Sequence, residues 1–455
     1  MKYHIVTLGC PKNAVDSEGM DGLLSTQGHQ AVASAEEADV IIVNTCSFIA
    51  AARAETLGVL KELAGRKRPG QRLIAAGCMA QSHPHEVVGV QGVDATLGTQ
   101  QWTQINALVG QLERPVIPLT PGQPVTTIPL TTTTNSQPTS YADWRTTQIR
   151  RTHQTPSAYL KISDGCNLRC AFCTIPSFKG DMRSKPVGAV LAEAQELVAG
   201  GVREIVLVAQ HLTDYGRDLG LKDGLATLLA ELCQVTPPET WIRLMYAYPH
   251  GISERLITMM ASYPQICHYL DMPLQHAHPA TLRRMRRPPD TDRTLRIIAE
   301  LRAAMPDIAI RSTFIVGYPG ETTAEFHALL EFLQTAQLDR VGAFRYSREP
   351  GTPAAELPDQ VRPQVIERRW HELMRLQQTI SYTRNQRWVG RTIKVLIEGN
   401  GTADDGSALS IGRSFRDAPE IDGQVFVWGN YPAGTMVPVQ ITQATAYDLW
   451  GEALG

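Results

Sequence analysis

Three cysteines, Cys166, Cys170 and Cys173, stand close together in the run CNLRCAFC at residues 166–173. Thiolates at this spacing on one tight loop can bind three irons of a four-iron, four-sulfur cluster and leave the fourth iron without a protein ligand. An open iron can bind a substrate or a cofactor, which a fully ligated electron carrier cannot do. The alternative is a zinc site with a fourth ligand elsewhere in the chain. The histidines that stand as candidates for that ligand are His211, His250, His276 and His278.

A second set of cysteines, Cys10, Cys46 and Cys78, is spread over the first eighty residues, and each one follows a short apolar stretch. If these stretches are parallel strands, their carboxyl ends lie on one edge of a sheet, and the three thiols converge there. We therefore predict a second three-cysteine cluster with one open iron; three buried core cysteines are the alternative. Gly9 and Gly77, beside Cys10 and Cys78, would let the backbone approach a bulky ligand closely.

The remaining cysteines, Cys233 and Cys267, are expected to be ordinary buried thiols. The 455-residue chain is 43% hydrophobic and 19% charged, which excludes a disordered protein. Its net charge of −2 excludes a global basic field for gripping nucleic acid, although a local patch is not excluded. No apolar run approaches the roughly 20 residues needed to span a bilayer, and the first residues resemble a strand rather than a signal segment. We expect a cytoplasmic protein with no membrane partner.

The elements that position these cysteines follow from the alternation of apolar runs and helical stretches. In residues 1–112 this alternation is typical of βαβ units with a parallel sheet. The expected strands are 4–8, 40–45, 73–76 and 95–97, with a helix over 51–67. Residues 114–156 are rich in Thr, Pro, Ser and Gln, and we interpret them as an extended linker.

From residue 158 onward the alternation resumes on a longer scale. The expected strands are 159–163, 204–209, 241–246, 268–271, 308–316 and 341–346, separated by helices such as 187–199, 223–233, 291–305 and 322–335. Six βα repeats fit a partial β/α barrel better than an open sheet, and active sites of such barrels lie at the carboxyl ends of the strands. A long helix over 364–388 follows. Short alternating runs at 392–397, 408–413, 424–427 and 436–444 then predict a small all-β barrel. The expected fold class is therefore α/β: a doubly wound parallel sheet, a partial (β/α) barrel and a C-terminal all-β barrel.

The run at residues 166–173 resembles the cluster-binding motif of the radical S-adenosylmethionine superfamily. This resemblance implies that the open iron chelates the amino and carboxylate groups of S-adenosylmethionine, and that one-electron reduction cleaves the cofactor to a 5′-deoxyadenosyl radical. Phe172, just before the third cysteine, matches the aromatic position that packs near the adenine in this superfamily. An ordinary core phenylalanine is the alternative.

Two open clusters and a terminal β-barrel together resemble the methylthiotransferase family over nearly the whole chain. Residues 7–18 (TLGCPKNAVDSE) are similar to its RimO branch, the ribosomal-protein aspartate methylthiotransferases, whereas the tRNA-modifying MiaB branch tends to have Gln-Met-Asn after the first cysteine. Lys179 and Asp164 depart from the usual Arg and Glu but keep the charge sign. Other matching stretches are residues 159–166, 273–276, 313–322 and 346–352.

The resemblance implies four parts with expected boundaries. These are an N-terminal methylthiotransferase domain with the auxiliary cluster (1–113), the linker (114–156), a radical S-adenosylmethionine core (157–386) and a TRAM-like barrel for substrate recognition (387–455). The core is expected to be a partial barrel of the radical S-adenosylmethionine type.

Several further residues stand where a ligand at the mouth of the partial barrel would lie. Gln210 and Arg311 are candidates for the amino-acid end or the ribose of S-adenosylmethionine, and Gly317 for close approach of its adenine; a purely structural role is the alternative for each. The basic run at residues 283–287 is interpreted as a solvated helix end rather than a contact surface. His276 is either a proton donor or a packed histidine. No catalytic side chain is assigned, because the cofactors supply the hard chemistry.

The function implied by the resemblance is addition of a methylthio group to the β-carbon of one aspartate in small-subunit ribosomal protein S-twelve. Two four-iron clusters, S-adenosylmethionine, an electron donor such as flavodoxin or ferredoxin and an unknown sulfur donor are implied. The alternatives are the same chemistry on a tRNA adenosine, or a non-catalytic iron–sulfur or zinc protein that binds RNA through the barrel. Residues 387–455 hold five basic and eight acidic residues, a balance that favours a basic protein partner over RNA.

Overall fold

The structure is a computed structural model that describes residues 1–113, 143–147, 149, 151 and 155–454. Most of the linker predicted over 114–156 therefore lies outside the described residues. The chain divides into two compact units, each treated separately below. The first comprises Met1–His153, Gly165–Asn167 and Thr174–Ala189, and the second comprises Gln154–Asp164, Leu168–Cys173 and Val190–Gly455.

The first unit is built on a five-stranded parallel sheet. Across the sheet its strands are β2 (Gln30–Ala31), β1 (Lys2–Thr7), β3 (Val40–Thr45), β4 (Arg72–Gly77) and β5 (Ala95–Gly98). All neighbouring pairs are parallel, with Thr7 opposite Asn44 and Thr45 opposite Gly77. The strand order reverses between β1 and β3, which is the switch point of a doubly wound fold. The prediction of a doubly wound parallel sheet is confirmed.

The side chains of these strands point alternately to the two faces of the sheet and are mostly apolar on both faces. Helices therefore cover both faces. Helix α2 (Ala50–Arg66) packs on one face, where its Leu60 joins Ile41 and Val43 in a buried cluster. Helix α1 (Pro11–Thr26) lies on the other face, where Asn44 donates hydrogen bonds to it. The other short elements of this unit are α3 (Cys78–Ser82), α4 (Pro84–Val88), η1 (Trp102–Gln104), α5 (Ile105–Glu113), α6 (Ile175–Lys179) and β8 (Arg183–Ser184).

The second unit contains a six-stranded parallel sheet whose order follows the chain. Its strands are β6 (Ser157–Lys161), β9 (Glu204–Val208), β10 (Trp241–Leu244), β11 (Ile266–Asp271), β12 (Ala309–Val316) and β13 (Arg340–Arg345). Among the described residues β6 and β13 are not paired, so the sheet is an open, partial barrel as predicted. Strands β9 and β10 are buried throughout, which explains why they are apolar except for Glu204 and Arg243.

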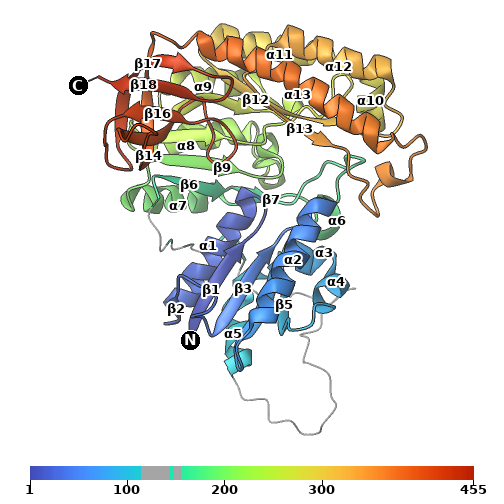
Figure 1. Cartoon of the computed structure of the whole chain (residues 1–455), viewed down its shortest axis with the longest axis vertical. Helices are drawn as coiled ribbons and strands as arrows, with labels where there is room; N and C mark the ends of the chain where they lie inside the picture. Colours follow the sequence, from blue (N-terminus) through green and yellow to red (C-terminus); the bar gives the residue numbers. More distant parts are fainter. Residues whose placement is uncertain (114–142, 148, 150, 152–154, 455) are drawn as a thin grey trace. The chain divides into compact units, whose positions relative to one another are not determined.

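Helices alternate with these strands. They are α7 (Val187–Ala199), α8 (Gly224–Val235), α9 (Glu254–Ser262), α10 (Pro279–Arg284), α11 (Thr291–Ala304), α12 (Thr323–Ala336) and the long α13 (Pro363–Gln386). Figure 1 shows α11, α12 and α13 side by side along one side of the sheet. The short elements are β7 (Ser163–Asp164), η2 (Leu212–Asp214), η3 (Arg217–Leu219), η4 (Pro249–Gly251) and η5 (Pro353–Glu356). Among the helices in the described ranges, none is long and apolar enough to cross a membrane.

The C-terminal residues form a closed five-stranded barrel, as predicted. Its strands are β14 (Thr392–Thr402), β15 (Ala408–Ser414), β16 (Val425–Trp428), β18 (Leu449–Ala453) and β17 (Met436–Ala444). Strand β18 is absent from the sequence-based expectation because its five residues include a glycine and show little alternation. It closes the barrel by pairing parallel to β16 and antiparallel to β17.

Buried ion pairs join this barrel to the first residues of the strands in the six-stranded sheet. Glu204, at the start of β9, is fully buried and lies 2.6 Å from Arg243 Nε and 2.5 Å from Arg413 Nη2. Arg340, at the start of β13, donates to Asp417 Oδ1 at 2.7 Å. Arg413 and Asp417 belong to the barrel region, so the barrel is a structural partner of the sheet.

The substitution Glu204→Gln is expected to lower the free energy of unfolding by about 3 kcal/mol, because Arg243 stays buried without its carboxylate and Arg413 keeps only the partly exposed Glu398. Burial raises the pKa of Glu204, but Arg243 and Arg413 outweigh it and bring the pKa down to about 2. This contribution to stability is therefore present above the ordinary pKa of a glutamate and is lost as the pH falls toward 2.

Chemical denaturation of the Glu204→Gln variant at several pH values measures this effect. Glu239→Gln is the matched control, since Glu239 forms an exposed pair with Arg203 at 3.9 Å and should change stability by less than about 1 kcal/mol. Equal stability losses in the two variants would contradict the assignment of Glu204 to the joint.

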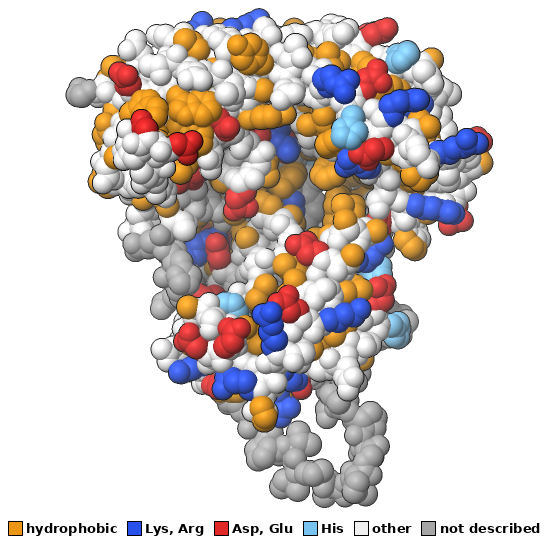
Figure 2. Space-filling view, viewed as in Figure 1, with side chains coloured by type: hydrophobic (Ala, Val, Ile, Leu, Met, Phe, Trp, Pro, Cys, Tyr) orange, Lys and Arg blue, Asp and Glu red, His pale blue; other side chains and the backbone are white. Residues whose placement is uncertain are grey.

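The surface of the barrel remains acidic after the buried charges are set aside. Arg413, Arg416, Asp417 and the side chain of Asp422 are buried. The remaining basic residues are Arg387, Arg391 and Lys394, and the remaining acidic residues are Glu398, Asp404, Asp405, Glu420, Asp448 and Glu452. Figure 2 shows acidic and hydrophobic side chains on the visible face of the barrel and basic side chains over α13 and its neighbourhood.

Candidate functional site

The three N-terminal cysteines lie where the strand order of the first sheet reverses. Cys10 is the residue before α1 and follows β1, Cys46 follows β3 directly, and Cys78 opens α3 directly after β4. These are the two strands at the switch point and the next strand along, and all three end on the same edge. Cys46 and Cys78 are buried and Cys10 is partly exposed.

The glycines beside these cysteines make room for protein atoms, and close approach of a bulky ligand to them stays a prediction. A Cβ on Gly9, whose φ is +93°, would lie 2.7 Å from Cys46 Sγ. A Cβ on Gly77, at φ +91°, would lie 2.2 Å from Asn44 Oδ1. Both positions therefore need glycine for the close approach of the three strand ends to one another.

Asn13 of α1 connects all three strand ends through one buried amide. Its Nδ2 donates to the carbonyl oxygens of Leu8 at 3.0 Å and Thr45 at 2.8 Å, which precede Cys10 and Cys46. Its Oδ1 lies 3.5 Å from the Cys78 sulfur, whose thiol donates to it. Sequence reasoning did not single out this contact, because it depends on residues up to 65 positions apart.

Burial raises the pKa of the Cys46 thiol above its ordinary value, and nearby Cys10 raises it further. The backbone N–H groups of Phe48 and Ser47 lower this pKa, but they do not outweigh the burial. A buried thiol of this kind is protonated at neutral pH. Metal ligation by Cys46 would therefore release a proton and become more favourable as the pH rises.

The substitution Asn13→Ala is expected to weaken iron binding at the N-terminal cysteines by roughly tenfold, because partners that orient ligands typically contribute that much. Loss of two buried hydrogen bonds should also lower stability by about 2 kcal/mol. Iron content after gel filtration, compared with thermal unfolding, measures both effects.

Asn106→Ala is the control for Asn13→Ala. Asn106 Nδ2 also donates to a carbonyl oxygen of this unit, that of Leu23 at 2.9 Å, but neither residue is adjacent to a cysteine in the chain. The control should lose some stability and retain its iron. Equal iron retention by both variants would contradict the role given to Asn13.

The loop of residues 166–173 is anchored on both sides. Within the first unit, Cys166 N donates to Gly180 O at 3.1 Å, and a Cβ on Gly165 (φ +80°) would clash with Asp181 O at 2.3 Å. Within the second unit, Ala171 N donates to Met285 O at 3.0 Å. Phe172 is half-buried beside Ala171, Met285, Ile315, Tyr318 and Ala354. Its packing against an adenine stays a prediction.

Gln210 follows β9 at the carboxyl end of the sheet and contacts the strand that enters the cysteine loop. Its Nε2 donates to Asp164 Oδ1 at 2.7 Å, while its buried Oε1 has no hydrogen-bond partner among the described residues. Both ring nitrogens of the adjacent His211 are likewise buried without a hydrogen bond within the described part of the chain, and Nδ1 lies 3.8 Å from Asp214 Oδ2. Burial lowers the pKa of His211 to about 4, against the opposing effect of Asp214, so its ring is neutral at pH 7.

Gly317 follows β12 directly and belongs to a buried hydrogen-bond network. Its N–H donates to Glu321 Oε2 at 2.5 Å, and a Cβ there would lie 2.3 Å from Ile366 of α13. Glu321 also accepts from Arg369 at 2.8 Å and lies 3.0 Å from His276 Nε2. His276 Nδ1 accepts the His278 N–H at 2.9 Å, so Nε2 carries the proton. The network makes His276 a packed, hydrogen-bonded histidine.

Arg311 lies near the start of β12 rather than at its carboxyl end. Its Nη1 donates to Asp271 Oδ1 at 2.8 Å, and its Nε lies 3.4 Å from Asp422 Oδ1 of the barrel region. Burial opposes its charge, but Asp271, Tyr269 and Asp422 raise the pKa of Arg311 above its ordinary value. These contacts support a structural role, and its contact with a cofactor stays a prediction.

The basic run at residues 283–287 is only partly the solvated helix end expected from sequence. Arg283 and Arg286 are exposed, but Arg284 pairs with Glu325 at 2.7 Å. Arg287 is buried, with its Nη1 3.7 Å from the Cys170 sulfur and its guanidinium 4.3 Å from the centre of the Tyr248 ring. The expectation was wrong for Arg287, because the chain turns inward after the helix.

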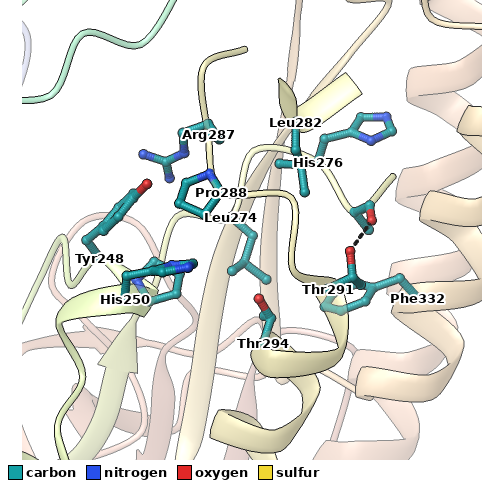
Figure 3. A pocket seen from close by; sticks show the side chains of 12 residues that line it. Tyr248, His250, Leu274, His276, Leu282, Arg287, Pro288, Thr291, Thr294 and Phe332 are labelled. Carbon is teal, nitrogen blue, oxygen red and sulfur yellow. Dashed lines mark hydrogen bonds between the residues drawn. The ribbon is translucent and has the colours of Figure 1, made fainter. Parts of the chain in front are cut away.

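A small pocket lies beside this arginine. Figure 3 shows Arg287, Tyr248 and His250 on one side of it and Leu274, Thr294 and Phe332 on the other. Its volume of about 20 Å³ has room for about one water molecule, which is too small for a cofactor. Within the described ranges, no three or more His, Cys, Asp or Glu side chains are grouped so as to hold a metal ion.

Three family models match this chain in order. Residues 2–98 match the uncharacterized protein family UPF0004, residues 160–333 match the radical SAM superfamily, and residues 389–454 match the TRAM domain. Among solved structures, the radical S-adenosylmethionine methyltransferase TsrM from Kitasatospora setae has a TM-score of 0.58 at 15% identity, covering 78% of this chain and 73% of its own. This likeness shows a shared fold.

Relatives of known name match the chain end to end. A protein of Chloroflexus aurantiacus, named ribosomal protein uS12 methylthiotransferase RimO, is 99% identical over 454 residues, which are 100% of both chains. Proteins of the same name from Roseiflexus castenholzii and Geobacter sulfurreducens are 68% and 42% identical. They align with all of this chain, and the alignments cover 96% and 98% of their own lengths.

Proposed function

The chain belongs to the RimO family of ribosomal protein uS12 methylthiotransferases, and from that premise we propose that it transfers a methylthio group to the β-carbon of an aspartate in uS12. The match to the radical SAM superfamily implies that the chain uses S-adenosylmethionine and one four-iron cluster. The second cluster and the position of the modified atom are our own proposals for this chain.

The observation that carries the proposal is the presence of two separate cysteine trios in one chain. Cys10, Cys46 and Cys78 meet at the switch-point edge of the first sheet, and a different trio stands in the loop at residues 166–173. We propose that each trio binds a four-iron cluster with one open iron. In such a cluster each thiolate binds a different iron, so the ligands stand farther apart than around a single ion.

The residues present fit these groups. The residues Cys46, Cys78 and Cys166 are buried, and the Gln210 and His211 side chains have buried polar atoms without a hydrogen bond among the described residues, after the end of β9. When bound, the cluster at residues 166–173 supplies an electron that cleaves S-adenosylmethionine to a carbon radical able to remove hydrogen from an unactivated carbon. The chain's part is to hold the thiolates and to orient the cofactor, with Phe172, Gln210, Arg311 and Gly317 as proposed contacts.

The acidic barrel supports a basic protein as substrate. Three basic against six acidic residues remain on its surface, which repels phosphate and attracts a Lys- and Arg-rich protein. Within the basic run, Arg284 and Arg287 are engaged inside the protein and so do not form an RNA-contacting patch. We propose residues 387–455 as a substrate-recognition domain beside the parts 1–113, 114–156 and 157–386. We also propose action in the cytoplasm with an electron donor such as flavodoxin or ferredoxin.

Mass spectrometry of uS12 tests the proposed function. The gene is expressed in a bacterial host that lacks its own uS12 methylthiotransferase, and uS12 is isolated and fragmented. We expect one aspartate-containing peptide to gain one sulfur and one CH₂ unit, with the added mass on the aspartate. A host whose uS12 stays unmodified while a tRNA adenosine gains the methylthio group would refute the substrate assignment.

A further inference from the structure

The short segment after α10 reaches the cysteine loop through both backbone and side chain. Helix α10 ends at Arg284, and Arg286 then adopts a left-handed conformation with φ +56°. The Arg287 N–H donates back to Leu282 O at 2.8 Å, the pattern of a Schellman cap. This cap turns the chain so that the Met285 carbonyl accepts the Ala171 N–H and the Arg287 side chain points to the Cys170 sulfur.

The Arg287 guanidinium is fixed on three sides. Its Nη1 lies 3.7 Å from Cys170 Sγ, its Nη2 donates to the Pro273 carbonyl, and its plane lies over the Tyr248 ring with 4.3 Å to the centroid. Figure 3 shows the guanidinium extended beside Tyr248. An arginine held in this way is oriented before any ligand arrives, unlike Arg283 and Arg286 of the same run, which are exposed.

Arg287 is also a buried cation without a carboxylate. It is 9% exposed, and among the described residues no Asp or Glu forms an ion pair with it. A buried charge is unfavourable unless an opposite charge compensates it. The group that it faces is a cysteine sulfur, which is anionic when it ligates iron.

We propose that Arg287 is a positioning residue that neutralises and hydrogen-bonds the Cys170 thiolate of the cluster bound at residues 166–173, and so makes this cluster easier to reduce. The role rests on the cluster assignment of the proposed function. Reduction adds negative charge to the cluster, and a fixed positive charge with an N–H donor at one ligand sulfur stabilises that added charge. Arg287 touches no reacting carbon in this role.

A redox titration followed by electron paramagnetic resonance tests this role in a full-length parent carrying Cys10→Ala, Cys46→Ala and Cys78→Ala, so that only the second cluster gives a signal. Adding Arg287→Gln is expected to lower the ratio of reduced to oxidised cluster about tenfold at a fixed potential, the effect of losing one charged hydrogen bond. Arg287→Lys keeps the positive charge but lacks the planar guanidinium, so it should lower the ratio of reduced to oxidised cluster by a smaller factor. Arg283→Gln, an exposed member of the same run, should give none.

An iron-loaded Arg287→Gln variant with the parent's potential would overturn the proposal, as would an equal shift in Arg283→Gln. If Arg287→Gln fails to fold, the Arg287→Lys variant decides: a shift to lower potential supports the role, and the parent's potential overturns it. A folded parent that binds no iron at residues 166–173 would instead refute the cluster assignment, and the role of Arg287 with it.

Discussion

Replacement of Cys166, Cys170 and Cys173 by alanine is expected to abolish both 5′-deoxyadenosine formation and methylthio transfer, down to the background of a reaction without enzyme. These thiolates are the only proposed ligands of the cluster that cleaves S-adenosylmethionine, so no radical forms without them. The N-terminal cysteines follow strands of the first sheet, and Cys78 keeps its contacts with Asn13 and Thr99. Chromatography of 5′-deoxyadenosine under reducing, oxygen-free conditions measures the first product, and the mass of a uS12 peptide measures the second.

Cys233→Ala is the matched control for this triple variant. Burial alone raises the pKa of the Cys233 thiol to about 11, as expected for a core thiol, and the residue is buried in α8. The control should retain both products. Formation of 5′-deoxyadenosine by the folded triple variant would show that the radical arises elsewhere.

Replacement of Cys10, Cys46 and Cys78 by alanine should separate the two products. We expect 5′-deoxyadenosine to form under reduction, because the loop at residues 166–173, its anchor at Met285 and the hydrogen bond from Gln210 to Asp164 are untouched. Methylthio transfer should fall to background, because the cluster proposed to carry the transferred sulfur has no ligands. Both products are measured in the same reaction.

Single substitutions refine the test of the N-terminal trio. Cys10→Ser should fold like the native protein, since Cys10 is partly exposed, whereas Cys46→Ser places a hydroxyl in a buried position and should lower stability as well. Thermal unfolding separates the loss of a cluster ligand, which both variants share, from the loss of stability expected only for Cys46→Ser. An N-terminal triple variant that is folded and holds the second cluster but forms no 5′-deoxyadenosine would contradict this division of roles.

The position of the N-terminal cysteines at one edge of the sheet was predictable because it depends on a general property of parallel sheets. Cys10, Cys46 and Cys78 each stand at a strand end, and the carboxyl ends of parallel strands share one edge. The amide of Asn13 that joins these ends was not predictable, because its partners lie at the ends of three separate strands. The contact of Gly9 with Cys46 was not predictable either, because sequence does not show that Cys46 fills the space beside it.

The joint between the terminal barrel and the sheet had a signal in the sequence that was not used. Glu204 and Arg243 are charged residues within otherwise apolar strands, and a buried charge needs a partner. The partner of Glu204 is Arg413, which lies more than 200 residues further along the chain, so that its identity follows only from the fold. Arg287 was missed for a related reason: a run of arginines is typical of a solvated surface, and the left-handed turn at Arg286 that directs Arg287 inward has no glycine to mark it.

The most direct test of the two-cluster account is the iron content of the native protein and of the two triple cysteine variants, reconstituted without oxygen and freed of loose iron. We predict about eight irons per native chain, from two four-iron clusters, and about four in each variant. Mössbauer spectra should show four-iron clusters in all three samples. A native chain with about four irons, or one that holds zinc in place of iron, would contradict the account.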